Sequence, residues 1–161
     1  MKCLMVIDVQ NGFVTSETSY IVPKIESLMD KFKDDMVIAT KFVNTENSGF
    51  TDIMKWEEMK ASPETDLLES IERRAKIVVE KNIYSACTQE TLNILRDYSI
   101  EEVHIVGIDT DCCVLKTAID LFEKNIRPIV ITEYCASTGG IESHRAAIKV
   151  LERTIGIEQI V

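Results

Sequence analysis

Residues 102–124 read EVHIVGIDTDCCVLKTAIDLFEK, and this stretch contains one complete strand–turn–helix unit. The apolar run Glu102–Ile108 has the length and composition of a buried strand. The segment Val114–Lys124 follows it with apolar residues at helical spacing; these are Leu115, Ala118, Ile119 and Phe122. The pattern predicts a strand, a short polar turn that contains two adjacent cysteines, and an amphipathic helix.

The same alternation of strand and helix extends over the rest of the chain. The other expected strands are Lys2–Val9, Met36–Val43, Lys76–Glu80, Pro128–Tyr134 and a short last one at Glu158–Val161. The other expected helices are Val22–Lys33, Asp66–Arg73, Thr88–Tyr98 and Glu142–Arg153. Near-continuous Val and Ile runs alternating with helices are typical of a parallel sheet. We therefore expect an α/β fold with about six strands and helices on both faces of the sheet.

Composition limits the classes of protein that this chain can belong to. A length of 161 residues corresponds to one ordinary domain, and we expect a single domain over residues 1–161. No apolar run approaches the ~20 residues of a membrane span, and the first residues resemble a core strand more than a signal peptide. A net charge of −9 without a basic stripe argues against nucleic-acid partners. A small molecule is the expected partner.

The cysteines indicate a reducing compartment. There are five of them, an odd number without C-x-x-C spacing, which fits neither a disulfide framework nor a zinc ribbon. Free thiols in a chain that begins without a secretory signal are typical of the cytosol, and the expected location is cytoplasmic.

Polar residues follow each expected strand, where open parallel sheets bind their ligands. They are Asp8, the loop from Asn44, Lys81, the turn Asp109–Cys113 and the segment after Tyr134. Because the carboxyl ends of parallel strands share one edge of a sheet, a carboxylate, an ammonium group and a thiol are expected at one crevice.

Together these groups could activate a cysteine. Only the thiolate of a cysteine is a good nucleophile, and a free thiol is mostly protonated at neutral pH. Cys113 is expected in the first turn of a helix, where unpaired N–H groups and the helix dipole favour an anion. Lys81 would add a positive charge, and Asp8 could accept the thiol proton and later return it to a leaving group.

Three motifs, VIDVQNGF (6–13), EKNIYSA (80–86) and VGIDTDCCVLKTA (106–118), resemble the isochorismatase-like cysteine hydrolases, as does ESHRAA (142–147). The resemblance covers essentially the whole chain and implies a three-layer, Rossmann-like fold. It places the family's catalytic triad on Asp8, Lys81 and Cys113. It also implies hydrolysis of C–N bonds in amides and in carbamoyl or ureido compounds through a covalent thioester-type intermediate.

The resemblance further implies an oxyanion hole formed by the N–H groups of Asp109 and Cys113, and a cis peptide bond between Ile108 and Asp109. The family commonly has Ala or another small residue where this chain has Asp109. An acid at this position should raise the pKa of the thiol unless it points away or is paired. The family pattern selects Cys113 over Cys112, which we expect to serve packing.

Metal binding is not expected. Nicotinamidase-type members of the family carry an Asp-x-His pair and a further His after the second strand, where this chain reads KFVNTEN (41–47). The histidines of the chain are His104 and His144, and both are expected to be structural. The resemblance therefore predicts a hydrolase without a metal or another cofactor. Isochorismatases that cleave a vinyl ether typically lack the cysteine, so that reaction is not expected.

Three aromatic residues, Phe13, Trp56 and Tyr84, are candidates for the walls of a substrate pocket. Trp56 is the most informative, because it lies in the polar stretch 44–62 where no strand or helix requires a large apolar residue. Family members usually associate, so a homo-oligomer is also expected. The alternative hypothesis is a catalytically weak family member that acts as a small-molecule binding or thiol-sensing protein.

Overall fold

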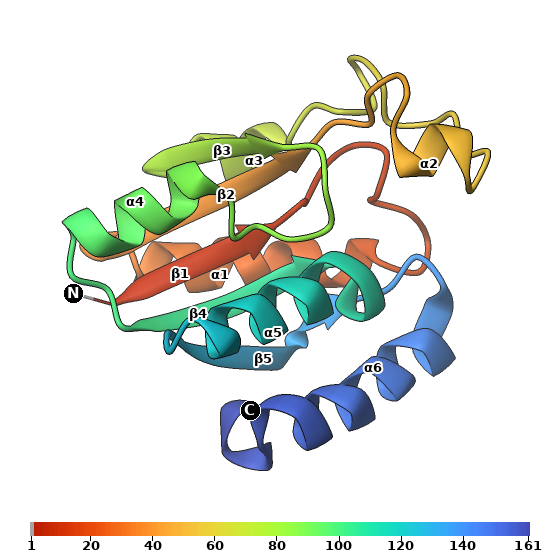
Figure 1. Cartoon of the computed structure of the whole chain (residues 1–161). Helices are drawn as coiled ribbons and strands as arrows, with labels where there is room; N and C mark the ends of the chain where they lie inside the picture. Colours follow the sequence, from red (N-terminus) through yellow and green to blue (C-terminus); the bar gives the residue numbers. More distant parts are fainter. Residues whose placement is uncertain (1) are drawn as a thin grey trace.

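The computed structural model describes residues 2–161 and contains a five-stranded parallel sheet of order β3-β2-β1-β4-β5 (Figure 1). The strands are β1 (Cys3–Ile7), β2 (Met36–Phe42), β3 (Ile77–Lys81), β4 (Glu102–Ile108) and β5 (Arg127–Ala136). The helices are α1 (Val22–Lys31), α2 (Gly49–Asp52), α3 (Glu69–Glu72), α4 (Gln89–Asp97), α5 (Leu115–Glu123) and α6 (Gly140–Ile155). Three shorter turns are η1 (Ser19–Ile21), the π-helical η2 (Thr110–Val114) and η3 (Ile157–Gln159).

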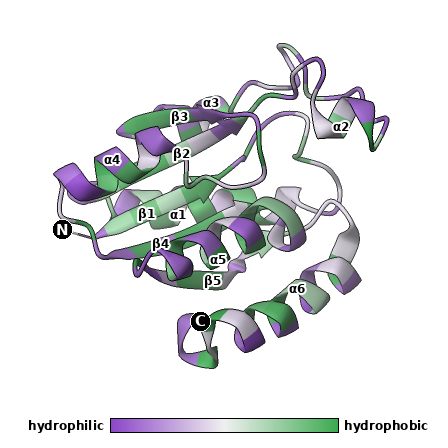
Figure 2. Ribbon diagram, in the orientation of Figure 1, coloured by the Kyte–Doolittle hydropathy of each residue, from purple (hydrophilic) through white to green (hydrophobic). Residues whose placement is uncertain are grey.

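Two apolar layers hold the sheet between its helices. Successive side chains of a strand point to opposite faces, and β1 is buried on both. Cys3, Met5 and Ile7 pack in the layer that includes residues of α4, α5 and α6, while Leu4 and Val6 pack in the layer beneath α1 and α3. In Figure 2 the central strands are hydrophobic and the outer helix surfaces are largely hydrophilic. This arrangement confirms the predicted α/β class with helices on both faces.

The predicted last strand is the clearest difference from the sequence-based expectation. The segment predicted at Glu158–Val161 forms the 3-10 turn η3, and Ile160 makes an isolated parallel bridge with Val130 of β5. One bridge is too short to count as a strand, so the sheet has five strands, and the C-terminal segment touches its edge strand β5 at this single bridge. The stretch 44–62, which was expected to be irregular, contains the one-turn helix α2.

The strand order reverses between β1 and β4, and their carboxyl ends lie side by side. Ile7 pairs with Gly107, whose φ is 124°. A Cβ at Gly107 would lie 2.2 Å from the Ile7 carbonyl oxygen, so a side chain at this position would force the two strands apart. The glycine therefore lets the turn after β4 approach the residues that follow β1, at the point where open sheets form their binding crevices.

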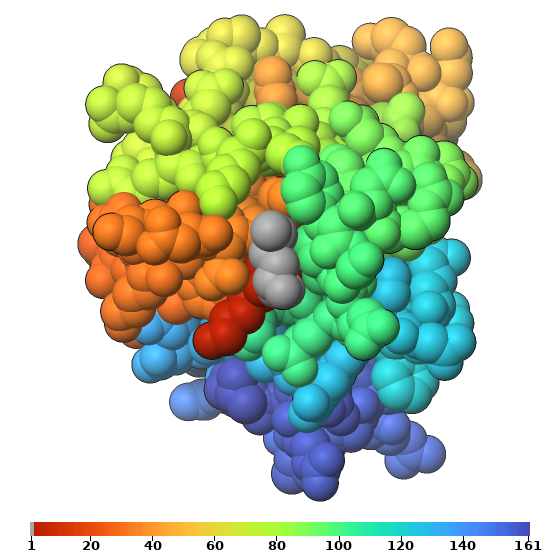
Figure 3. Space-filling view, turned by 90° about the vertical axis from the view of Figure 1, so that its left-hand side faces the viewer, coloured from red at the N-terminus to blue at the C-terminus, as the bar shows by residue number. Residues whose placement is uncertain are grey.

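The amino ends of the strands lie at the opposite end of the molecule. Figure 3 shows this face, where the segment before β2, the α4–β4 connection and the C-terminal segment come together. Among the described residues, no helix is both long and apolar enough to span a bilayer.

Candidate active site

Asp8, Lys81 and Cys113 come together beyond the carboxyl ends of three strands. Lys81 is the last residue of β3, Asp8 directly follows β1, and Cys113 lies in η2 after β4. The Nζ atom of Lys81 lies 2.7 Å from Oδ2 of Asp8 and 3.5 Å from Sγ of Cys113. The structure thus brings the three residues of the predicted triad into one hydrogen-bonded group.

The Asp8 carboxylate is completely buried and has a partner on each oxygen. Lys81 donates to Oδ2, and the hydroxyl of Thr40 in β2 donates to Oδ1 at 2.6 Å. The backbone N–H of Asp8 donates to the same Thr40 oxygen at 3.2 Å. Asp8 adopts φ 49°, a left-handed conformation that aspartate tolerates better than most residues. Thr40 could not be identified from the sequence, because a threonine inside a strand resembles an ordinary core residue.

Lys81 is also held by the chain that follows it. Its Nζ donates to the carbonyl oxygens of Ile83 at 3.0 Å and Tyr84 at 3.1 Å, and it lies 5.1 Å from the ring centroid of Phe42. The side chains of Lys81 and Asp8 are both 0% exposed. A buried charge is costly unless it is paired and hydrogen-bonded, and these contacts meet that requirement.

The turn that carries Cys113 has the geometry implied by the family resemblance. The peptide bond between Ile108 and Asp109 is cis. The Asp109 carbonyl oxygen then accepts hydrogen bonds from the N–H groups of Cys112 at 3.2 Å and Val114 at 3.0 Å, the residues on either side of Cys113. The turn is π-helical, a form that occurs mostly as single turns and frequently at functional sites.

The expected lowering of the Cys113 pKa is wrong. Burial raises the pKa of the Cys113 thiol well above its ordinary value, and the negative charge of Asp8 raises it further. The positive charge of Lys81 opposes this shift without overcoming it. The helix terminus and Lys81 are visible in the sequence, but the desolvation of a thiol that is 6% exposed is not. The resting thiol is therefore protonated and lies beside a carboxylate.

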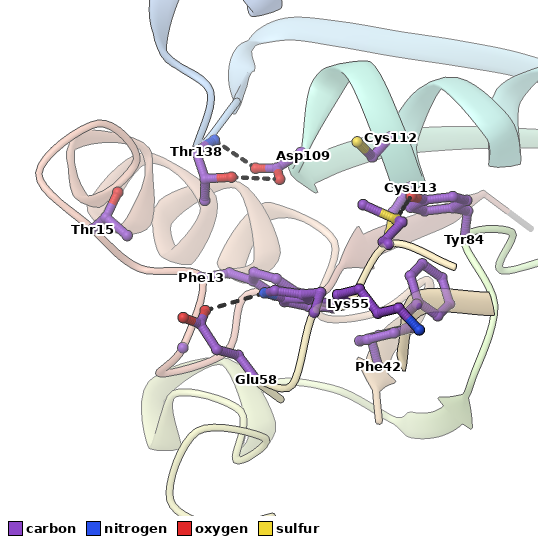
Figure 4. A pocket seen from close by; sticks show the side chains of 14 residues that line it. Phe13, Thr15, Phe42, Lys55, Glu58, Tyr84, Asp109, Cys112, Cys113 and Thr138 are labelled. Carbon is purple, nitrogen blue, oxygen red and sulfur yellow. Dashed lines mark hydrogen bonds between the residues drawn. The ribbon is translucent and has the colours of Figure 1, made fainter. Parts of the chain in front are cut away.

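A pocket of about 500 Å³ opens in front of Cys113 (Figure 4). Phe13, Trp56 and Tyr84, the three predicted wall residues, all line it, together with Phe42 and Phe50. The rings form one connected wall. Trp56 stacks on Phe13 and on Phe42, with ring centroids 6.3 and 6.1 Å apart, and Phe50 meets Tyr84 edge-on at 4.9 Å.

Hydrogen bonds fix the loop that carries Trp56. The buried Asn44 side chain donates to the carbonyl oxygens of Trp56 and Glu58 and accepts from the hydroxyl of Ser48. The Trp56 indole N–H donates to the Glu58 carboxylate at 3.2 Å. The buried Gln10 exchanges hydrogen bonds with the backbone of Phe42, which joins the loop after β1 to the end of β2. Asn44 was named from the sequence only as the start of the polar loop after the second strand, and Gln10 was given no role of its own.

Asp109 has a partner that the sequence did not reveal. Its Oδ1 accepts from the Thr138 N–H at 2.6 Å and its Oδ2 from the Thr138 hydroxyl at 2.7 Å, as Figure 4 shows. Both residues line the pocket. Asp8, and not Asp109, is the acid that raises the pKa of Cys113, while burial followed by Asp111 and Asp109 raises the pKa of Cys112 to about 11. The expected rise in pKa caused by Asp109 thus applies to the thiol of Cys112 and not to that of Cys113.

Cys112 and His144 differ in how well they match the roles expected from the sequence. Cys112 does not only serve packing, because it is half-buried and lines the pocket next to Cys113. His144 of α6 is hydrogen-bonded through Nδ1 to the Thr110 hydroxyl at 2.8 Å, which confirms the structural role expected for it. This contact ties α6 to the turn that carries Cys113.

The residues after β2 do not fit a metal site of the nicotinamidase type. Asn44 is the buried polar side chain there, and its amide is occupied by the loop hydrogen bonds. His104 packs edge-on against Phe32, and His144 is bound to Thr110, so neither imidazole points to this region. Within residues 2–161, Asp109, Asp111 and Cys112 do place ligand atoms within 4.8 Å of one another, but both Asp109 oxygens already accept from Thr138.

The isochorismatase domain model matches residues 2–159. The chain belongs to the isochorismatase family. An uncharacterized isochorismatase family protein PncA of Bacillus subtilis is 36% identical over 81 residues, which cover 50% of this chain and 44% of that protein. Isochorismatase family protein 1A of Dictyostelium discoideum is 33% identical over 75 residues, which cover 45% of this chain and 36% of that protein. The matched segments thus span less than half of these curated relatives.

Solved structures resemble the whole chain. A nicotinamidase/pyrazinamidase PncA from Bacillus subtilis superimposes with a TM-score of 0.84 at 25% identity, and the match covers 100% of both chains. An N-carbamoylsarcosine amidase from Thermoplasma acidophilum gives a TM-score of 0.84 at 25% identity and covers 97% of this chain and 94% of that one. The protein is therefore a member of the isochorismatase family whose structural neighbours include proteins described as amidases.

Proposed function

We propose that this protein is a metal-independent cysteine hydrolase that cleaves a C–N bond of a small amide, carbamoyl or ureido compound through a covalent intermediate on Cys113. The observation that carries the proposal is the contact of one buried ammonium group, Lys81 Nζ, with both the Asp8 carboxylate and the Cys113 sulfur. A base, a nucleophile and a cation within hydrogen-bond reach form the arrangement that covalent catalysis requires.

The first half of the reaction forms the intermediate. Asp8 accepts the thiol proton of Cys113 while the sulfur attacks the carbonyl carbon, and Lys81 balances the negative charge that passes between them. The N–H groups of Asp109 and Cys113 hold the oxyanion of the tetrahedral intermediate. When the C–N bond breaks, Asp8 returns the proton to the departing nitrogen, which leaves as ammonia or an amine, and the acyl group remains on sulfur.

The second half releases the acid. A water molecule attacks the thioester carbon, and Asp8 takes one proton of that water. Collapse of the second tetrahedral intermediate breaks the C–S bond, and the proton returns from Asp8 to the sulfur of Cys113. A thiol that is protonated at rest is compatible with this cycle, because the proton needs to leave only as the carbon–sulfur bond forms.

The test is a panel of small amides and ureides assayed by ammonia release, with the wild type and Cys113→Ala side by side. We expect turnover of at least one compound by the wild type and loss of turnover in Cys113→Ala, with the circular dichroism spectrum unchanged. Cys112→Ala is the matched control, since it removes the neighbouring pocket thiol, and it should retain turnover. Full hydrolysis by Cys113→Ala would overturn the proposal.

The raised pKa of Cys113 favours one alternative, a small-molecule binding protein with weak hydrolysis. It does not favour thiol sensing, because redox-sensing cysteines combine a low pKa with solvent access. Saturable binding of panel compounds without any ammonia release would support the binding alternative over the hydrolase.

A further inference from the structure

The Asp109 side chain has two properties that the proposed mechanism does not use. It lines the same pocket as Cys113, and it makes no ion pair within residues 2–161. Both of its carboxylate oxygens face Thr138, and each accepts a single hydrogen bond from that residue. An ionised carboxylate offers about four acceptor sites, so about two remain unused.

The geometry of the proposed reaction limits which part of a substrate can reach the unused acceptor sites of the Asp109 carboxylate. The leaving nitrogen must lie near Asp8, which protonates it and is completely buried behind Cys113. The carbonyl oxygen must lie near the N–H groups of Asp109 and Cys113. The remaining substituent of the carbonyl carbon then extends into the open pocket, where Asp109 and Thr138 form one side and the aromatic rings form the other.

From this geometry we infer that Asp109 is a specificity-determining residue that selects substrates with an N–H donor on the non-leaving side of the scissile carbonyl. The inference rests on the proposed function and refines it, because a ureido compound carries such an N–H group and a simple carboxamide carries a CH group there. An N–H donor would complete the hydrogen bonding of the carboxylate. A CH group would displace water from the carboxylate without replacing the lost hydrogen bonds, and this loss makes the binding free energy less favourable.

Thr138 is the positioning residue in this account. Its two hydrogen bonds, at 2.6 and 2.7 Å, fix the plane of the carboxylate and hold it at the edge of the pocket. They do not neutralise it, since both donors are uncharged. Burial raises the pKa of Asp109 and Thr138 lowers it, so the threonine helps to keep the acid in its acceptor form.

Phenylurea and phenylacetamide form a matched substrate pair, because they differ only by NH in place of CH₂ next to the carbonyl, and both release ammonia. Their ratio of kcat/KM is compared among the wild type, Asp109→Ala and Thr138→Val. Asp109→Ala should lower the phenylurea-to-phenylacetamide ratio about tenfold to a hundredfold, the effect of one hydrogen bond to a charged acceptor. Thr138→Val should lower it by a smaller factor. Asp34→Ala, which removes an exposed acid before β2, should leave the ratio unchanged.

Binding measurements separate failure of this inference from failure of the proposed function. Dissociation constants of both compounds for Cys113→Ala and for Cys113→Ala with Asp109→Ala are measured by titration calorimetry. A preference for phenylurea that depends on Asp109 supports the inference even if the wild type hydrolyses neither compound, in which case the hydrolase proposal fails alone. A ratio unchanged by Asp109→Ala, a parallel loss on both compounds, or no binding of either would overturn the inference.

Discussion

The floor and the wall of the pocket are built in different ways. The floor consists of Cys113, which lines the pocket, and of Asp8 and Lys81, which are buried behind it at the ends of β1 and β3 with side chains that are 0% exposed. The wall is largely aromatic, and most of it lies outside the sheet: Phe13, Trp56 and Tyr84 are on loops and Phe50 is in α2, while Phe42 ends β2. Trp56 is half-buried. The difference indicates that the sheet fixes the reacting groups while loops form the surface that a substrate contacts.

The two parts also differ in the forces that hold them. The floor depends on charge, because Lys81 Nζ bridges a carboxylate and a sulfur with little access to water. The wall depends on ring contacts with centroids 4.9 to 6.3 Å apart and on the hydrogen bonds of Asn44. Substitutions in the floor should therefore change chemistry and stability, while substitutions in the wall should change substrate binding.

The largest expected effect is that of Asp8→Asn. The amide cannot accept the thiol proton, so kcat should fall by about 10²- to 10⁴-fold, the range for loss of a general base. KM should change little, because Asp8 lies behind the nucleophile. Steady-state ammonia release measures both values. A variant with wild-type kcat and a raised KM would show that Asp8 acts in binding and would break the distinction between floor and wall.

Lys81→Met should reduce the free energy of unfolding by about 3–5 kcal/mol, because it leaves a buried carboxylate without its cation. Urea denaturation followed by circular dichroism gives this value. The double variant Asp8→Asn, Lys81→Met removes both charges and should be less destabilised than Lys81→Met alone. Additive losses in the double variant would show that the two charges are not coupled.

Trp56→Ala should raise KM for substrates with a ring by about three- to tenfold, the value of one aromatic pair. The value of kcat should stay near that of the wild type, since the floor is intact. Trp56→Phe is the control, because it keeps a ring at the wall but removes the hydrogen bond to Glu58. If Trp56→Ala reduces kcat and leaves KM unchanged, the wall takes part in the chemistry.

The smallest expected effect is a shift in the pH dependence of Cys113 alkylation. In the wild type the midpoint should lie above the pKa of a free thiol, because burial and the Asp8 charge both stabilise the protonated form. Asp8→Asn removes the negative charge and keeps Lys81, so the midpoint should move to lower pH. Iodoacetamide labelling with peptide mass mapping measures it. A midpoint that rises or stays fixed in Asp8→Asn would contradict the account.

Sequence patterns located the residues of the floor for a physical reason. A polar residue after a continuous apolar strand is visible in the sequence, and the shared edge of a parallel sheet brings such residues together. Asp8, Lys81 and Cys113 were found in this way, and the family resemblance assigned their roles. The strand boundaries were likewise close, as Glu102–Ile108 shows.

The contacts that position these groups were not predictable in the same way. Thr40, Thr138 and Asn44 make hydrogen bonds to partners 12 to 32 residues away, and no local pattern marks a residue for such a contact. The sign of the Cys113 pKa shift was also missed, since it depends on burial that only the packed turn creates. Likewise, the last strand was reduced to the bridge at Ile160 because the chain enters it through the 3-10 turn η3.

The central claim is that Cys113 carries the acyl group during turnover, and acid quenching followed by peptide mass mapping tests it most directly. The best substrate of the amide and ureide panel is mixed with the enzyme, the reaction is stopped during turnover, and the peptides are analysed. The account predicts an added acyl mass on Cys113, retained in Cys112→Ala and absent in Cys113→Ala. An acyl group on Cys112, or turnover by Cys113→Ala at the wild-type rate, would contradict it.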